Sequence, residues 1–416
     1  MSNRAVIAVV VIVALLVLAY LARSPDMVPA LAPEPADAPT AAQSEQTGPE
    51  HPAPTPAPAK STMEGHAPEA MERGAMDHGA MAGGAGEDKN EKAMTSEGMA
   101  EGEMNGEHGG HDMSSINADA APIIPESVQG NRLLEPKIVD GVKVFELTAR
   151  VVQWHILPDV TVAAYVYNDQ LPGPQLRVRP GEKLRINFKN ELPEPTTIHW
   201  HGLIPDNAMD GVPFISQPPV QPGGTFVYEF AAPNSPGTFF YHTHFATDRQ
   251  DILGLHGAFV VEDVQASKEY AVDQLILLNE HRMVGGKTYP AMDFDNMLPN
   301  YFTINGKSFP STQSFKAKVG DKLLFRFVGS GQFIHPMHIH GGPFEIIATD
   351  GYPVPPGARL TKDTVLIGPG ERYDVVWTAR KPGKWLMHCH ITHHLTNDGK
   401  EAMGAGGLTT FIEVSP

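Results

Sequence analysis

The sequence predicts an all-β protein with two Greek-key β-sandwich domains, which follow an N-terminal transmembrane or signal helix and a disordered linker. Three observations support this fold class. The chain has 416 residues, 41% of them hydrophobic, which is enough for one or two substantial cores. Its 40 Gly and 38 Pro divide β-branched and aromatic runs, as expected of short strands joined by turns. From about residue 136 these runs form two series of roughly seven or eight strands, the count of a small sandwich.

The two series of strands are similar to each other, which indicates a duplicated domain. RVRPGEKLRINF in the first series is similar to AKVGDKLLFRF in the second, and GTFFYHTH is similar to GKWLMHCH. The two copies meet near Val264 to Tyr270. We therefore expect the first sandwich at residues 136–265 and the second at residues 266–416.

An apolar run of about 18 residues, Ala5 to Ala22, follows Arg4 and is near the lower limit for crossing a bilayer. Residues 1–23 fit either a signal anchor or a cleaved signal peptide. No small-x-small cleavage site follows directly, which favours an uncleaved anchor. The charge of Arg4 places the N-terminus in the cytoplasm, so the rest of the chain is expected on the periplasmic or extracellular side, anchored to the cell membrane.

Residues 24–135 are expected to form a disordered linker, because most of this segment has few aromatic or β-branched residues to bury. Its first half is rich in Pro and Ala, and its second half in Met and His. Thioethers are soft ligands that suit Cu(I), so transient copper capture is one interpretation, and biased composition without function is the other. The residues in question are Met63, His66, Met71, Met76, His78, Met81, Met94, Met99, Met104, His108, His111 and Met113.

The charge distribution excludes one class of partner. About −13 of the formal net charge of −17 falls between Arg23 and Pro125. The remaining chain is nearly balanced and has no basic stripe, so a nucleic-acid partner is not expected. Cys389 is the only cysteine, which rules out an intramolecular disulfide.

Four histidine motifs carry the chemistry. Histidines at positions i and i+2 of a strand project from the same face, roughly 7 Å apart, so two such strands can surround a metal cluster. One HxH pair alone is a weak signal that also suits surface histidines, core histidines or a zinc site. Four such motifs, one of them around the only cysteine, are a strong signal. The motifs are HWHG (His199 to Gly202), HTH (His242 to His244), HPMHIHG (His335 to Gly341) and HCHITHH (His388 to His394).

Strand parity divides these ligands between two sites. In the HCH segment both imidazoles point to one face of the strand and the thiol of Cys389 points to the other. His335 differs in parity from the HxH pair that follows it, so it is expected on the side of Cys389. With His394, five residues beyond the cysteine, the set is two imidazoles and one thiolate, as in a blue copper electron-transfer centre.

The remaining eight histidines form four i,i+2 pairs, two from each predicted sandwich. Eight imidazoles can hold three copper ions where domains meet. They are His199, His201, His242, His244, His338, His340, His388 and His390.

These motifs, in this order, resemble those of multicopper oxidases, and QLPGPQLRVRPGE (Gln170 to Glu182) resembles a segment of that family's first cupredoxin domain. The resemblance extends from roughly Pro136 to the C-terminus. It implies two cupredoxin-like sandwiches and four copper ions: one type 1, one type 2 and a type 3 pair. With the cysteine in the second of two domains, the chain is similar to the two-domain, or small, laccases. Those relatives form homotrimers in which the cluster lies between the first domain of one subunit and the second of its neighbour.

The resemblance also implies a role for each ligand. His335, Cys389 and His394 would bind type 1 copper, and His199 and His338 type 2 copper. The ligands of the type 3 pair would be His201, His242, His244, His340, His388 and His390.

Two further site residues follow from the resemblance. The family often has an axial Met or Leu ten residues after the cysteine, where this chain has Gly399. Met403 is the candidate axial ligand, and a non-coordinating or different group, which would raise the potential, is the alternative. Asp210, in MDGVP, resembles the acid that the family places near type 2 copper, where it would supply protons; the alternative is a turn aspartate before Gly211.

The function implied is that of an oxidase. A reductant, either Cu(I), another metal ion or a phenol, would give up electrons near type 1 copper, with His335 or His394 receiving them. Cys389 would pass electrons along its backbone to the neighbouring histidines, and dioxygen would be reduced to water. His155, His256 and His393 are expected to pack, cap or face solvent.

Three other functions are consistent with some of the motifs. A copper-binding or sequestration protein without enzymatic activity would use the Met- and His-rich linker, but would not need the HxH pairs. A copper nitrite reductase-like enzyme would have its cysteine in the first domain, where this chain has HTH. A blue copper electron carrier would not need eight additional histidines.

Overall fold

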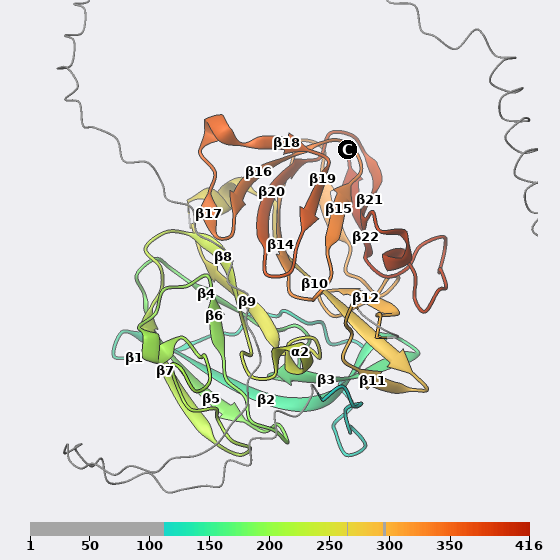
Figure 1. Cartoon of the computed structure of the whole chain (residues 1–416). Helices are drawn as coiled ribbons and strands as arrows, with labels where there is room; N and C mark the ends of the chain where they lie inside the picture. The colour runs from blue at the N-terminus through green and yellow to red at the C-terminus, as the bar shows by residue number, and fades with distance from the viewer. Residues whose placement is uncertain (1–111, 264, 294–296) are drawn as a thin grey trace, which may run out of the picture. The chain divides into compact units, whose positions relative to one another are not determined.

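The structure of the protein is a computed structural model that describes residues 112–263, 265–293 and 297–416 (Figure 1). The predicted N-terminal helix and the predicted linker up to residue 111 lie outside the described residues. No helix within the described residues is long and apolar enough to cross a membrane. This part of the chain is mostly β-strand, as predicted. Its helices are short: η1 (Asn207–Met209), α2 (Thr247–Gln250), η2 (Ala266–Glu269), η3 (Pro356–Ala358) and η4 (Thr392–Leu395).

The first sandwich is built from two sheets. One sheet has the order β1-β2-β5-β7, with β3 also paired to β2, and the other has the order β4-β9-β8-β6. The strands of the first sheet are β1 (Lys137–Val139), β2 (Val142–Leu157), β3 (Val160–Tyr167), β5 (Lys183–Asn190) and β7 (Thr225–Ala231). Those of the second are β4 (Gly173–Val178), β6 (His199–His201), β8 (Gly237–His242) and β9 (His256–Val261).

The core of the first sandwich determines which way the histidines of β6 and β8 point. Trp200 and Tyr241 are fully buried, and their rings pack 5.8 Å apart. Because successive side chains of a strand point to opposite faces, burying Trp200 turns His199 and His201 to the outer face. Tyr241 does the same for His242, which pairs with His199 across the two strands.

The second sandwich also has two sheets. The larger has the order β11-β10-β14-β20-β16-β17, with β12 paired to β10 and β18 to β16, and the smaller has the order β13-β22-β21-β15-β19. The larger contains β10 (Val272–Val284), β11 (Lys287–Tyr289), β12 (Tyr301–Ile304), β14 (Lys322–Gly329), β16 (Phe344–Thr349), β17 (Tyr352–Pro353), β18 (Leu360–Lys362) and β20 (Arg372–Thr378). The smaller contains β13 (Phe315–Lys318), β15 (His335–Ile339), β19 (Thr364–Ile367), β21 (Gly383–Cys389) and β22 (Thr409–Ser415).

In the second sandwich, strands β15 and β21 give the two sites opposite faces. Met337 pairs with Cys389, and His338 pairs with His388. The odd-numbered residues of β15 are buried in the core and the even-numbered ones are partly exposed. The thiol of Cys389 therefore faces the core while the HxH pairs face outward, as strand parity predicts.

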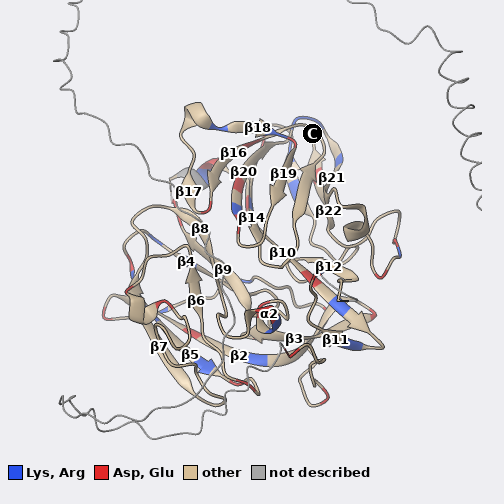
Figure 2. Ribbon diagram, viewed as in Figure 1, with Lys and Arg blue, Asp and Glu red and all other residues tan. Residues whose placement is uncertain are grey.

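The two sandwiches are joined between the end of β9 and the start of β10, and they share buried contacts. Ala258 and Val260 of β9 pack in one apolar cluster with Leu275 and Leu277 of β10. Close by, the buried Asp374 accepts hydrogen bonds from Thr238 of the first sandwich (2.7 Å) and from Arg326 (2.7 Å). Figure 2 shows Lys and Arg dispersed among Asp and Glu on both sandwiches, without a continuous basic stripe in the described ribbon.

The structure differs from the prediction at the C-terminal end of the linker. Ile116 lies in the core of the first sandwich, and Ile124 packs in a cluster with Trp154. The Arg249 guanidinium holds this segment by donating to the carbonyls of Asp112 and Ser114. The last part of the predicted linker therefore packs against the sandwich, because its few isoleucines and its backbone find partners there.

Candidate metal centres

The predicted type 1 ligands lie together in the core of the second sandwich. His335 and Cys389 are fully buried, His394 is 2% exposed, and the ligand atoms of the three lie within 4.8 Å of one another. The Nδ1 atom of His394 is 3.2 Å from Nδ1 of His335 and 3.6 Å from Sγ of Cys389. His394 comes from η4, which directly follows β21, and its ring stacks on Phe302.

The chemistry of these three residues fits a copper ion. Burial lowers the pKa of His394 to about 3, so its imidazole is neutral at pH 7 and has a lone pair to donate. Burial also raises the pKa of Cys389 to about 11, so a bound cation is needed to hold it as a thiolate. His335 donates from Nε2 to Glu280 at 2.5 Å, which leaves its Nδ1 lone pair facing the other two ligands. Two imidazoles and one thiolate in a dry pocket are the donors of a blue copper centre.

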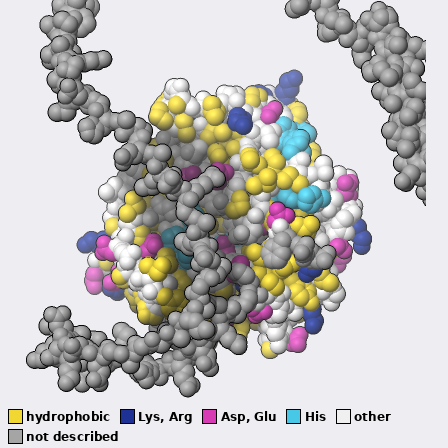
Figure 3. Space-filling model, in the orientation of Figure 1, with side chains coloured by type: hydrophobic (Ala, Val, Ile, Leu, Met, Phe, Trp, Pro, Cys, Tyr) yellow, Lys and Arg dark blue, Asp and Glu magenta, His cyan; other side chains and the backbone are white. Residues whose placement is uncertain are grey.

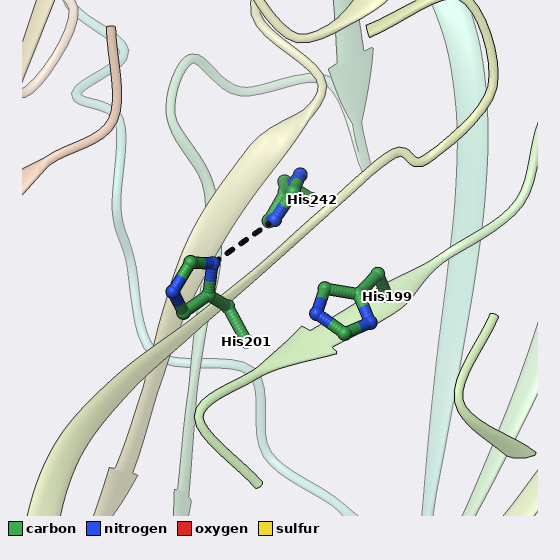
Figure 4. Close-up of side chains that lie close together, drawn as sticks. All are labelled: His199, His201 and His242. Atoms are coloured by element: carbon green, nitrogen blue, oxygen red, sulfur yellow. Dashed lines mark hydrogen bonds between the residues drawn. The ribbon is translucent and has the colours of Figure 1, made fainter. Parts of the chain in front are cut away.

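The four histidines of the first sandwich form one outward-facing group. His199 lies 5.3 Å from His242 and 5.4 Å from His244, measured between ring centroids. Figure 4 shows His199, His201 and His242 converging from neighbouring strands, with Nδ1 of His201 3.3 Å from Nε2 of His242. The ligand atoms of these three lie within 4.8 Å of one another.

The second sandwich has a matching group on β15 and β21. His338 lies 4.9 Å from His340 and 5.2 Å from His390 between ring centroids. The Nε2 atoms of His340 and His388 are 3.0 Å apart. Figure 3 shows histidine side chains at the surface of this sandwich, and His340 and His390 are among the exposed residues.

Backbone carbonyls orient one ring in each strand of these groups. His199 donates from Nδ1 to the carbonyl of Asp210 at 2.8 Å, and His242 donates to that of Thr243 at 2.7 Å. In the second sandwich His338 donates to the carbonyl of Asp363, and His388 to that of Cys389, each at 2.8 Å. Fixing Nδ1 as the donor leaves the Nε2 lone pair for a metal, the arrangement that ligating histidines usually have.

Four of these eight rings have a lowered pKa, which favours the neutral form that metal binding requires. Burial, with the charge of Arg372 as a second cause, lowers the pKa of His201 to about 3. Burial also lowers the pKa of His242, His340 and His388. Among the described residues, each close contact between two imidazoles of these groups joins histidines of the same sandwich.

The structure places Asp210 beside the first-sandwich group. It caps η1, and its Oδ1 lies 3.5 Å from Nδ1 of His199. Gly211 has φ of +81°, and a Cβ there would lie 1.8 Å from the carbonyl oxygen of Ile198. Asp210 is therefore both a turn residue, held against the strand by the following glycine, and a carboxylate within reach of the cluster.

Met403, the predicted axial ligand, is wrongly assigned. It is 83% exposed, with φ of +55°, in the loop closed by hydrogen bonds between Ala402 and Ala405. Leu408 is instead the buried residue next to the ligands: its carbonyl accepts from the N–H of Cys389 and its N–H donates to the carbonyl of His394. The long loop between them moves Met403 into solvent, which the spacing from the cysteine could not reveal.

Two other observations concern the route by which electrons could reach the buried centre. His335 is fully buried and His394 is 2% exposed, so these two rings offer a reductant outside the protein almost no contact surface. His393, one of three histidines expected to pack or face solvent, is exposed, and its ring contacts that of His394 at 4.4 Å between centroids. Glu280 was not identified from the sequence, where its only signal is an acid just after the apolar run of β10.

Two sequence profiles, both described as multicopper oxidase, match residues 148–266 and residues 286–400. The chain is 31% identical over 251 residues to the multicopper oxidase MmcO of Mycobacterium tuberculosis, an alignment that covers 52% of this chain and 48% of that protein. It is 33% identical over 237 residues to Laccase-1 of Trametes villosa, covering 52% of this chain and 44% of the laccase. It thus spans about half or less of the length of these curated relatives.

Among solved structures, the Blue Copper Oxidase from Nitrosomonas europaea is similar with a TM-score of 0.58 and 32% identity, covering 66% of this chain and 86% of that one. The structure named Multicopper Oxidase mgLAC is similar with a TM-score of 0.61 and 32% identity, over the same shares of the two chains. The fold and the copper-type ligand sets define a cupredoxin-like copper protein. The chain belongs to the multicopper oxidase family, and its two sandwiches, with the cysteine in the second, match the small laccase-like arrangement.

Proposed function

We propose that the protein is an oxidase that couples one-electron oxidation of a reductant to the four-electron reduction of dioxygen to water. The observation that carries this proposal is the position of Cys389 on β21. Its thiol belongs to the buried centre, its two neighbours belong to the outward-facing histidine group, and its carbonyl accepts a hydrogen bond from His388 at 2.8 Å. A single strand thus connects the two sites by covalent bonds and one hydrogen bond.

Four copper ions are proposed for each chain. Bound copper would supply one-electron redox chemistry at the buried site and dioxygen reduction at the cluster. His335, Cys389 and His394 would hold type 1 copper, and the buried Leu408 beside them has no group that could coordinate it. His199 and His338 would hold type 2 copper. The type 3 pair would be held by His201, His242, His244, His340, His388 and His390.

A homotrimer is proposed because, among the described residues, each close imidazole contact joins two histidines of the same sandwich. His244, His340 and His390 are exposed in the single chain, whereas a cluster that binds and reduces dioxygen must hold its ligands firmly. Joining the first sandwich of one subunit to the second sandwich of its neighbour would enclose all eight rings. Repeating that head-to-tail contact three times closes a ring.

Asp210 is proposed to deliver protons to the cluster. Its carboxylate lies 3.5 Å from the His199 ring and is 30% exposed, so it can exchange protons with solvent on one side and with the cluster on the other. The next residue, Gly211, packs closely against the carbonyl of Ile198. This packing fixes the backbone of Asp210 and keeps its carboxylate at that distance from His199.

The physiological reductant is proposed to be Cu(I), another metal ion or a phenol. We place its docking site over His393, since this exposed ring contacts the buried His394. Electrons would then pass from the surface to the buried centre through ring contacts.

The N-terminal segment is proposed to anchor the protein to the cell membrane, with the sandwiches on the periplasmic or extracellular side. The Met- and His-rich part of the linker is proposed to capture Cu(I). Deleting residues 63–111 should raise the Cu(I) concentration needed for half-maximal oxidation and leave phenol oxidation unchanged. An equal effect on both reductants would mean that the segment is only a spacer.

The oxidase proposal is tested with purified, copper-loaded protein. We expect an intense blue absorption from thiolate-to-copper charge transfer, about four copper ions per chain, and oxygen uptake with a phenol as reductant. Copper binding without oxygen uptake would support the alternative, a copper-sequestering protein. That alternative is less well supported, because sequestration does not require two sites joined through one cysteine.

A further inference from the structure

Glu280 of β10 is a buried acid that no step above uses. Its side chain and that of His335 are both fully buried, and Oε1 of Glu280 lies 2.5 Å from Nε2 of His335. The other oxygen, Oε2, accepts a hydrogen bond from the backbone N–H of Gln332 at 3.2 Å. The carboxylate thus touches a proposed copper ligand on the side away from the metal position.

The loop before β15 is shaped around this carboxylate. A Cβ at Gly331 would lie 2.0 Å from Oε2 and 2.5 Å from Oε1 of Glu280, so any other residue there must push the carboxylate aside. Ser330 fixes the same loop by donating to the carbonyl of Leu278 at 2.9 Å. The position of Glu280 is therefore built into two segments of the second sandwich.

The carboxyl group of Glu280 has no lysine or arginine partner among the described residues. Its partners are one imidazole and one backbone N–H. A buried carboxylate is costly unless it is paired. A metal cation held by His335 and Cys389 would provide the missing positive charge.

A carboxylate that accepts the distal N–H of a ligating imidazole has two known physical effects. It fixes the ring's tautomer and orientation, and it makes the ligand more basic. A more basic ligand, together with a nearby negative charge, stabilises Cu(II) more than Cu(I), because Cu(II) carries the higher charge.

We propose that Glu280 is a positioning residue for the type 1 site: it presents Nδ1 of His335 to the metal and lowers the reduction potential of the bound copper. This inference rests on the proposed function, since it assumes copper at the His335, Cys389 and His394 site. A lowered potential favours electron donors that are themselves easily oxidised and narrows the range of phenols that can reduce the centre.

The first experiment compares reduction potentials in the copper-loaded protein. Glu280→Gln keeps the size of the side chain and an oxygen that can accept from His335, and removes the charge. We expect the equilibrium between the blue centre and a one-electron redox mediator to shift at least tenfold towards reduced copper, which is ~59 mV. Glu413→Gln, at an exposed ion pair of the same sandwich, should leave it unchanged. A Glu280→Gln shift of less than twofold would overturn the proposal.

A second variant displaces the carboxylate without removing it. Gly331→Ala should force Glu280 off Nε2 of His335, raise the potential in the same direction, and lower the affinity of the site for Cu(II) by about 10-fold or more. If Glu280→Gln fails to load copper, this variant and the following measurement decide. An unchanged potential and affinity in Gly331→Ala would contradict the positioning role.

The third measurement needs no copper. In metal-free protein labelled with ¹⁵N-histidine, NMR should show His335 as the Nε2–H tautomer with a slowly exchanging proton, and Gly331→Ala should abolish that protection. A Nδ1–H tautomer in the unsubstituted protein would refute the pairing. If the protein never turns blue with copper, the proposed function fails while this measurement still reports whether Glu280 orients His335.

Discussion

His388 donates a hydrogen bond from Nδ1 to the carbonyl oxygen of Cys389, the next residue in the chain, at 2.8 Å. The bond ties a ring of the outward-facing group to the backbone of the residue whose thiol lies in the buried centre. It bypasses part of the covalent path between the two proposed copper sites. Substitutions at either end should therefore separate the properties of the two sites.

Replacing Cys389 with Ser should remove the blue colour and turnover with every reductant. Serine is a harder and far weaker ligand than a thiolate, so type 1 copper should be lost. The eight outward-facing histidines are untouched, and the protein should keep about three copper ions per chain, measured by elemental analysis and by paramagnetic resonance. Loss of all copper would contradict the division of ligands by strand face.

Replacing Met403 with Ala should leave the blue centre unchanged, because this side chain is 83% exposed. Leu408→Met, in contrast, should lower the reduction potential of type 1 copper, since a thioether at that position can approach the metal as an axial ligand. Potentiometric titration of the blue absorption measures both variants. A changed spectrum in Met403→Ala would restore Met403 as the axial ligand.

Replacing Asp210 with Asn should slow dioxygen reduction by about 10²-fold or more, the contribution typical of a positioned proton donor. Reduction of type 1 copper under anaerobic conditions should stay at its normal rate. Stopped-flow reoxidation of fully reduced protein by oxygen separates the two steps. Asp206→Asn, at an exposed acid in the same loop, is the matched control and should reoxidise normally.

Mixing two inactive variants tests the proposed trimer. His201→Ala disables the first-sandwich half of the cluster and His340→Ala the second-sandwich half. If the cluster forms between neighbouring subunits, co-expression of the two should yield mixed trimers in which some clusters have both halves intact, with partial recovery of oxygen uptake. No recovery in verified mixed oligomers would place the whole cluster within one chain.

Replacing Arg326 with Met should destabilise the protein by about 3–5 kcal/mol, because it leaves the buried carboxylate of Asp374 without the arginine that pairs with it. Arg326 pairs with Asp374 and Asp273 at the contact between the sandwiches. Arg185→Met breaks an exposed pair with Glu229 and should cost about 0–1 kcal/mol. Urea unfolding followed by tryptophan fluorescence compares the two, and similar costs would contradict this assignment.

Much of the ligand arrangement could be predicted from the sequence because a strand has a strict period of two. The alternation around Trp200 and around Cys389 assigns a face to the histidines of these strands, and the burial pattern of β6 and β15 agrees with it. The β-sandwich class follows from the same alternation and from the spacing of the turns. The N-terminal helix and most of the linker lie outside the described residues and stay predictions.

Other features were set by contacts between residues far apart in the chain. Met403 was misplaced because a loop's path depends on what it packs against, and Leu408 enters the core in its stead. Glu280 meets His335 across 55 positions of sequence, which no local pattern encodes.

The sequence by itself determined the fold class, the sorting of histidines by strand face and the membership of Cys389 in a separate buried site. Only the tertiary structure decided the burial of His335 and His394, the exposed position of Met403 and the carboxylate beside His335. The physical reason is that strand periodicity is local and repeats every two residues, whereas burial and hydrogen bonding to a ligand depend on which distant segments pack around it.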